Sequence, residues 1–374
     1  MRRYDIDNLR VIAFALLIFY HVGMFFVPWD FHIKNSIIYE GITFPMLFLN
    51  QWRLSLLFII SGMGTYYALM KRNSTQFAIE RLKRLFIPFI LGMIFIVPPQ
   101  VYFERLDKGQ FSGSYFDYWP KEAFAGIYPE GNISWHHLWF ILYLLIFSLI
   151  LIPAFIYIKK NPDMWMLRKL KMIISKAFGL YIFIIPLFLW GMLLAPHFPQ
   201  TNGLINDWYN LVNYCTLFFF GYLLISLKDV FWDAVTKNRH IFLICGIIGF
   251  PLLMSLWYLI ESFPLKDEIQ TFVKMFNSWS WILTLIGYAA VYLNKPSKTL
   301  TYANEAVYPF YILHQTIIIA LGYYLKDADM GFCPKFSIMV TGTFGISWFI
   351  YEFGIRRYSI IRPLFGMKPK ANNR

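Results

Sequence analysis

Two ionisable residues with a regular spacing stand in the first apolar segment of the chain. Arg10 and His21 lie in the stretch DIDNLRVIAFALLIFYHVG, and Asp7 precedes Arg10 by three residues. Eleven residues make about three helical turns, so Arg10 and His21 share a face about 16 Å apart and cannot touch. Asp7 lies on the same face and can pair with Arg10. An imidazole in this setting can serve as a general base, and the alternative is a histidine hydrogen-bonded between helices for packing.

The second apolar segment carries two further polar residues. Arg53 is predicted at about the depth of His21, where it can stabilise an oxyanion or hold an acidic substrate group; alternatively, it snorkels outward with no chemical role. Ser61 stands in FIISG, directly before Gly62. A nucleophilic serine needs a base within reach, whereas the small pair favours close packing of helices.

Basic and aromatic residues elsewhere add candidates for binding. Arg81 and Arg84 in RLKR are three residues apart, so they share a helical face that can clamp phosphates or attract anionic lipid. His137 and Trp139 stand in HHLWF, and His314 stands in YPFYILHQT. These three are candidate contacts for a substrate or an oxyanion.

The composition indicates what kind of structure must position these residues. The chain has 374 residues, of which 58% are hydrophobic and only 15% are charged. Soluble domains contain roughly 25% charged residues, so a water-soluble globule, a disordered chain, a collagen and a coiled coil are all excluded. The sequence predicts an all-α, polytopic integral membrane helical bundle.

Membrane-spanning helices need about 20 mostly apolar residues. About ten segments meet this criterion, and an even number places both termini on the same side. The predicted spans are 9–28, 45–70, 85–103, 137–158, 174–195, 208–227, 240–260, 273–293, 306–325 and 335–353.

The distribution of charge orients these spans. If both termini are cytoplasmic, the inner segments hold 24 of the 34 lysines and arginines and the outer segments hold 8. This asymmetry follows the positive-inside rule. The net charge of +13 is therefore explained mainly by membrane orientation, and no nucleic-acid partner is expected.

The connections between spans suggest one domain over residues 1–374. Segment 71–84 is basic with an apolar side, and we expect it along the inner membrane surface. The longest outer loop, 104–135, contains eight aromatic residues that suit either a sugar platform or a membrane interface. The basic tail 354–374 is expected in the cytoplasm.

Some sites are not expected from the sequence. No spacing typical of a metal site and no glycine-rich phosphate loop is present, so no metal is predicted. All 21 Asp and Glu residues lie outside the spans or near their ends. Proton-coupled carriers commonly use carboxylates within the membrane, so this distribution weighs against a carrier.

Taken together, these features resemble the membrane-bound acyltransferase-3 family, in particular its glucans biosynthesis protein C-like branch. The resemblance covers nearly the whole chain in order. The matching features are the Arg10–His21 spacing preceded by Asp7, YHVGMFF…FHIKNS, LFIISG, RLKRLFIP, HLWF and YPFYILHQT.

The resemblance implies an integral O-acyltransferase of the bacterial inner membrane. Such an enzyme moves an acyl group, acetyl or succinyl, from cytoplasmic acyl-CoA to a hydroxyl of an extracytoplasmic glycan. It implies a catalytic role for His21 with Arg10 and Asp7, and donor binding by Arg81 and Arg84.

The expected partners are the lipid bilayer, acyl-CoA (acetyl-CoA or succinyl-CoA) and a glycan acceptor. No permanently bound cofactor is expected, and a homodimer is compatible with the sequence. Direct transfer and a covalent acyl-enzyme relay both stay open. The alternative function is a carrier or flippase that exports a glycan or a lipid-linked precursor.

Overall fold

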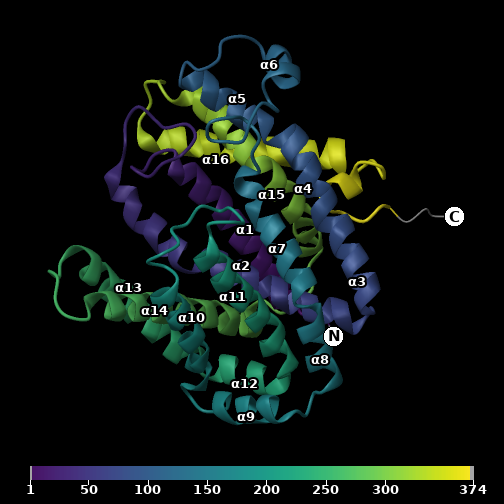
Figure 1. Cartoon of the computed structure of the whole chain (residues 1–374), viewed down its shortest axis with the longest axis vertical. Coiled ribbons are helices and arrows are strands. Elements are labelled where there is room, and N and C mark those ends of the chain that lie inside the picture. The colour runs from purple at the N-terminus through teal and green to yellow at the C-terminus, as the bar shows by residue number, and fades with distance from the viewer. Residues whose placement is uncertain (1, 371–374) are drawn as a thin grey trace. The chain divides into compact units, whose positions relative to one another are not determined.

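The computed structural model describes residues 2–370 (Figure 1). Helices form almost all regular structure in this range, and its one strand-like pairing is an isolated bridge between Ile127 and Ile133. The prediction of an all-α protein is therefore confirmed. The last four residues of the predicted tail 354–374 lie outside the described residues.

The first half of the chain contains long helices joined by short 3₁₀ (η1, η4) and π-helical (η2, η3) stretches. The elements are α1 (Tyr4–Met24), η1 (Glu40–Ile42), α2 (Thr43–Met70), α3 (Ser74–Arg81), η2 (Leu82–Phe86), α4 (Ile87–Leu91), η3 (Gly92–Ile96), α5 (Pro98–Asp107), α6 (Tyr115–Lys121), η4 (His136–Leu138), α7 (Trp139–Ile150) and α8 (Ile152–Lys160).

The second half continues in the same way and ends in a short 3₁₀ turn. The elements are α9 (Trp165–Ile174), η5 (Gly179–Phe183), α10 (Ile184–Leu193), α11 (Trp208–Ser226), α12 (Asp229–Lys237), α13 (Arg239–Tyr258), α14 (Lys266–Tyr292), α15 (Lys298–Leu325), α16 (Phe332–Phe349), η6 (Ile350–Ile355) and η7 (Arg362–Phe365).

Seven helical segments of the described chain are long and apolar enough to cross a membrane. An eighth is the pair His136–Ile150 and Ile152–Lys160, which bends by 49°. Pro153 explains this bend, because proline lacks an amide donor and clashes with the preceding turn. The seven are Tyr4–Met24, Glu40–Met70, Ser74–Asp107, Trp208–Ser226, Arg239–Tyr258, Lys298–Leu325 and Phe332–Ile355.

The predicted count of ten spans is not confirmed, although each of the ten segments overlaps helix. Segment 174–195 contains only a short apolar helix, Gly179–Leu193. Segment 273–293 lies in α14, which is long enough but begins with charged residues. The cytoplasmic placement of both termini stays a prediction.

Residues 74–84 of the predicted basic segment 71–84 are the first turns of a longer helical run. This run continues through two π-helical stretches, η2 and η3, to Asp107. π-Helical turns widen a helix locally and often occur near functional sites.

The chain forms two compact units, each assembled from segments far apart in the sequence. Unit 1 comprises Met1–Ala13, Phe48–Ala78 and Ile146–Leu300. Unit 2 comprises Phe14–Leu47, Ile79–Leu145 and Thr301–Arg374. The single domain over residues 1–374 stays a prediction.

In unit 1, α13 and α14 lie side by side (Figure 1), and α2 crosses α11 closely. At the α2–α11 crossing, a Cβ added at Gly62 would overlap the carbonyl oxygen of Phe218, and one added at Gly221 would overlap that of Ile59. Close backbone approach of this kind needs a small residue in both helices. The sequence-based packing interpretation of the FIISG motif is therefore supported.

We expect Gly62→Ala to destabilise the fold by about 1–3 kcal/mol, the usual cost of overpacking a tight interface. The measurement is the thermal unfolding midpoint of the purified protein in detergent. Gly345→Ala is the matched control, since nothing lies within 4 Å of a Cβ at this exposed position of α16. An unchanged midpoint for Gly62→Ala would contradict the close crossing.

Unit 2 has an apolar core formed by the end of α1, α15 and α16. Val22, Phe25, Ile318 and Met339 are fully buried in it. This packing fixes α1 against α15. It therefore also fixes the polar side chains of the two helices that lie next to this core.

Candidate functional site

The centre of the candidate site is a pair of histidines from α1 and α15. Nδ1 of His21 lies 2.7 Å from Nε2 of His314, and the two rings are stacked with centroids 4.9 Å apart. His314 is fully buried, and His21 is half-buried. Two residues predicted separately as candidates are thus in direct contact.

Hydrogen bonds determine which nitrogens of the neutral pair carry protons. Nδ1 of His314 lies 2.6 Å from the carbonyl oxygen of Tyr311, which can only accept, so this nitrogen is the donor. Nε2 of His314 therefore accepts from Nδ1–H of His21. The neutral His21 then has its lone pair on Nε2, the nitrogen at which a base would take up a proton.

The third candidate histidine, His137, also contacts α15. Its Nε2 lies 3.0 Å from the carbonyl oxygen of Ile312, and its ring meets that of His314 edge-on at 5.2 Å. The hydroxyl of Tyr311 donates to the carbonyl of His137. The structure therefore brings His21, His137 and His314 together, and we call these three residues the histidine cluster.

A polar network extends from His137 toward α5. The amide nitrogen of Gln100 lies 3.5 Å from Nδ1 of His137 and donates to Thr316 at 2.8 Å. Gln315 donates to Gln100 at 3.4 Å and approaches Nε2 of His32 at 3.2 Å. Buried amides of this kind are satisfied only as part of a network.

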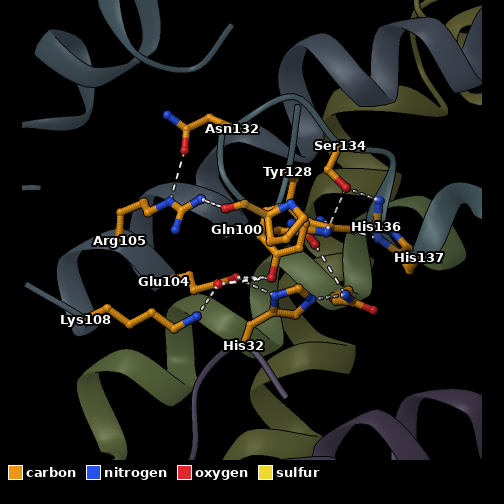
Figure 2. A network of polar contacts seen from close by, with 12 residues as sticks. His32, Gln100, Glu104, Arg105, Lys108, Tyr128, Asn132, Ser134, His136 and His137 are labelled. Atoms are coloured by element: carbon orange, nitrogen blue, oxygen red, sulfur yellow. Dashed lines mark hydrogen bonds and ion pairs between the residues drawn. The ribbon is translucent and has the colours of Figure 1, made fainter. Parts of the chain in front are cut away.

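The network ends at Glu104, which is almost completely buried near the end of α5 (Figure 2). Its carboxylate lies 2.7 Å from Nδ1 of His32 and 2.6 Å from the ammonium of Lys108, and it accepts a hydrogen bond from Tyr128 at 3.1 Å. Burial, and then the negative charge of Glu104, raises the pKa of Tyr128 to about 12. Tyr128 therefore remains a hydrogen-bond donor at neutral pH.

Sequence reasoning missed His32, Gln100, Glu104 and His136. Glu104 fits the statement that carboxylates lie near span ends, but its burial has no local signature in the sequence. The available signal was His32 in FHIKNS, because a histidine close to the end of an apolar helix is a candidate partner for the helices around it.

A lysine fixes the chain that carries His32. The ammonium of Lys34 donates to the carbonyl of Met24, the last residue of α1, and to those of Val27 and Trp29 in the segment that follows. Burial lowers the pKa of Lys34 to about 8, and the carboxylate of Asp30 opposes this shift. Lys34 thus satisfies the carbonyl at the end of α1 and two carbonyls of the following turn.

The other predicted catalytic residues occupy the start of α1, in unit 1. Nη1 of Arg10 forms the expected ion pair with Asp7 at 3.0 Å, and Asp7 also pairs with Arg2 at 2.8 Å. A Cβ added at Gly64 of α2 would lie 3.6 Å from Nη2 of Arg10. The Asp7–Arg10 pair is confirmed, and its catalytic role stays a prediction.

The remaining candidate residues of α2 and α7 are Arg53, Ser61 and Trp139. Arg53 is buried in α2, and its proximity to His21 stays a prediction because the two residues belong to different units. Ser61 donates to the carbonyl of Leu57 within its own helix at 2.7 Å. Trp139 is buried edge-on against Tyr143, with ring centroids 5.1 Å apart.

Arg81 is the last residue of α3, and Arg84 lies three residues further on, in η2. Arg84 is exposed; its Nε donates to the carbonyl of Gly366 at 3.0 Å, and its Nη1 lies 3.8 Å from Glu80. Arg84 therefore links η2 to the C-terminal segment. Binding of a donor by the two arginines stays a prediction.

The aromatic residues of the loop after α5 contact the helical run Ser74–Asp107. Trp119 donates to the carbonyl of Ile94 at 3.0 Å and stacks on Phe95 at 5.9 Å. Tyr102 meets the rings of Phe111 and Tyr118. These contacts favour packing over a free sugar platform.

The fold and the site define a polytopic helical membrane protein with a buried cluster of histidines in one unit. The chain belongs to the acyltransferase-3 family, since the model of this acyltransferase domain matches residues 3–352. The resemblance inferred from the motifs is confirmed.

Curated relatives align with this chain over almost its whole length. The chain is similar to glucans biosynthesis protein C of Salmonella paratyphi B, Salmonella agona and Salmonella enteritidis. In each case 20% of residues are identical, over 98% of this chain and 95% of the relative. No solved structure matches the chain.

Proposed function

We propose that this protein is an O-acyltransferase that moves an acetyl or succinyl group from cytoplasmic acyl-CoA to a hydroxyl of an extracytoplasmic glycan. Membership of the acyltransferase-3 family supports acyl transfer. The named function of the similar Salmonella proteins supports a glucan-like acceptor. The observation that carries the proposal is the contact between His21 and His314.

The proposed reaction uses His21 as a general base. Nε2 of His21 removes the proton from the acceptor hydroxyl while the oxygen of this hydroxyl attacks the thioester carbonyl. The C–S bond of the tetrahedral intermediate then breaks, and the protonated His21 returns the proton to the leaving thiolate. His314 acts as a positioning residue, because it accepts from Nδ1–H of His21 and so keeps the lone pair on Nε2.

In this proposal, basic residues bind the acyl-CoA donor. The phosphates of acyl-CoA need cationic groups, and Arg81 and Arg84, which belong to the same unit as His21, are assigned to them. A donor contact of Arg10 and an oxyanion contact of Arg53 stay predictions from the sequence. The bacterial inner membrane, with both termini in the cytoplasm, is part of this proposal.

The function is tested with the purified protein in nanodiscs, supplied with radiolabelled acetyl-CoA or succinyl-CoA and a soluble glucan. We expect label on the glucan with one of the two donors and none without protein. The alternative is a carrier or flippase for a glycan or a lipid-linked precursor. Substrate flux in proteoliposomes without transfer from either donor would favour that alternative.

We expect the double variant Arg81→Gln/Arg84→Gln to raise the KM for acyl-CoA about tenfold or more, with a much smaller change in kcat. Each charge-assisted hydrogen bond to phosphate is worth about 1.5–3 kcal/mol, and about 1.4 kcal/mol corresponds to a factor of ten. Initial rates over a range of donor concentrations measure this.

Lys83→Gln is the matched control, since Lys83 is exposed and lies between the two arginines. An unchanged donor dependence in the double variant would assign Arg81 and Arg84 to lipid anchoring instead.

A further inference from the structure

Three segments far apart in the sequence bring two histidines and a carboxylate together beside the histidine cluster. They are His32 after α1, Glu104 in α5 and His136 at the start of η4 (Figure 2). One ring nitrogen of each histidine and one carboxylate oxygen of Glu104 all lie within 4.8 Å of one another. We call these residues the His32–Glu104–His136 site.

One ring nitrogen of His136 is hydrogen-bonded, and the other is not. Its Nδ1 lies 3.1 Å from the hydroxyl of Ser134, whereas its Nε2 is buried and has no hydrogen-bond partner among the described residues. A buried nitrogen without a partner costs free energy unless a ligand satisfies it. The backbone of His136 also has a φ of 37°, a left-handed conformation that is strained for a histidine and often marks a functional site.

Glu104 is arranged to offer one oxygen while the other is held. Oε1 interacts with the ammonium of Lys108 at 2.6 Å and with the hydroxyl of Tyr128 at 3.1 Å. Oε2 faces His32 at 2.7 Å. Donors of this kind on the non-ligating oxygen orient a carboxylate toward a metal.

We propose that the His32–Glu104–His136 site binds a divalent transition-metal ion of the zinc class. Two imidazoles and one carboxylate form a ligand set that zinc accepts and that calcium and magnesium, which prefer oxygen, do not. Ligand atoms bound to one tetrahedral ion at the usual 2.0–2.2 Å stand about 3.4 Å apart. To reach this spacing, Nδ1 of His32 and Oε2 of Glu104 must move apart from 2.7 Å, and wider pairs, all within 4.8 Å, must close. The fourth position stays available to water.

Metal binding requires a change of tautomer at His32, because its Nδ1–H now donates to Glu104. The ring proton moves to Nε2, which faces Gln315 at 3.2 Å. The side-chain amide of Gln315 can accept it after exchanging its nitrogen and oxygen, which gives up the 3.4 Å hydrogen bond to Gln100. Two cations lie near the site. The half-exposed side chain of Lys108 can move its ammonium into solvent, and the guanidinium of Arg105 is held on the carbonyls of Pro129 and Gly131.

This inference goes beyond the proposed acyl transfer and does not depend on it. The sequence predicted no metal, because the three ligands come from separate segments and form no recognisable spacing. An ion here would join the chain after α1, α5 and the end of the aromatic loop.

The test measures zinc on the purified full-length protein in detergent, after removal of metals with EDTA and reloading with zinc chloride. We expect one more tightly held zinc ion per chain in the wild type than in His136→Ala or Glu104→Gln. In competition with a chromogenic chelator, each variant should bind zinc at least about 100-fold more weakly. His197→Ala, which removes an exposed histidine outside the site, should bind as the wild type does.

A second readout covers variants that fail to fold. Cobalt bound by the wild type should give the intense visible absorption of a tetrahedral site, and zinc should displace it. Equal zinc contents in the wild type and in folded His136→Ala would overturn the proposal, as would the absence of cobalt uptake by the wild type.

Discussion

His21→Ala is expected to lower kcat for acyl transfer by about 10²–10⁴-fold, the range that general-base catalysis contributes. The KM for acyl-CoA should change little, because the residues assigned to its phosphates lie elsewhere. Initial rates with saturating glucan and varied acyl-CoA measure both constants. The physical reason is that alanine leaves no group to take up the hydroxyl proton as the C–O bond forms.

The matched control for this variant is His197→Ala, at an exposed histidine outside the histidine cluster. It should keep the wild-type kcat. His21→Ala with wild-type kcat would remove His21 from the reaction and return it to a packing role. A loss of activity together with a lowered unfolding midpoint calls for His21→Gln, which retains polarity but has no basic nitrogen. This variant should fold and stay inactive.

His314→Leu is expected to lower kcat on the order of 10²-fold without raising the KM for acyl-CoA. Leucine fills the buried space but cannot accept from Nδ1–H of His21, which now meets Nε2 of His314 at 2.7 Å. The His21 ring then loses the acceptor that fixes the proton on Nδ1, so the tautomer with the lone pair on Nε2 is no longer favoured. Loss of orientation for a catalytic histidine typically has effects of this order or larger.

His314→Gln distinguishes positioning from bulk packing. The glutamine amide oxygen can reach the place of Nε2 and accept the same proton, so this variant should recover a substantial part of the kcat lost in His314→Leu. Equal kcat in the leucine and glutamine variants, or an effect on KM alone, would contradict the positioning role. The unfolding midpoints of the two variants provide the check on stability.

The fold class and the helix positions could be predicted because membrane helices have a strong local signal. All ten predicted segments overlap helix, since a run of apolar residues indicates a helix without tertiary information. The number of spans could not be predicted in the same way. α14 begins with charged residues, and Gly179–Leu193 is short, so helix alone does not establish a crossing.

The members of the histidine cluster could be predicted one at a time but not as a cluster. His21 and His314 each interrupt an apolar helix, which makes either one a candidate. Their contact joins residues 293 positions apart, and only the packing of α1 against α15 creates it. The same holds for His32 and Glu104, which are 72 positions apart and became visible as a pair only in the fold.

The central claim is that the protein, with His21 as the general base, transfers an acyl group from a cytoplasmic donor to an acceptor on the other side of the membrane. Inside-out membrane vesicles that enclose glucan and receive radiolabelled acyl-CoA from outside test it most directly. We predict labelled glucan inside wild-type vesicles and none above background in His21→Ala vesicles that contain the same amount of protein. Equal labelling of the enclosed glucan in both preparations would contradict the account.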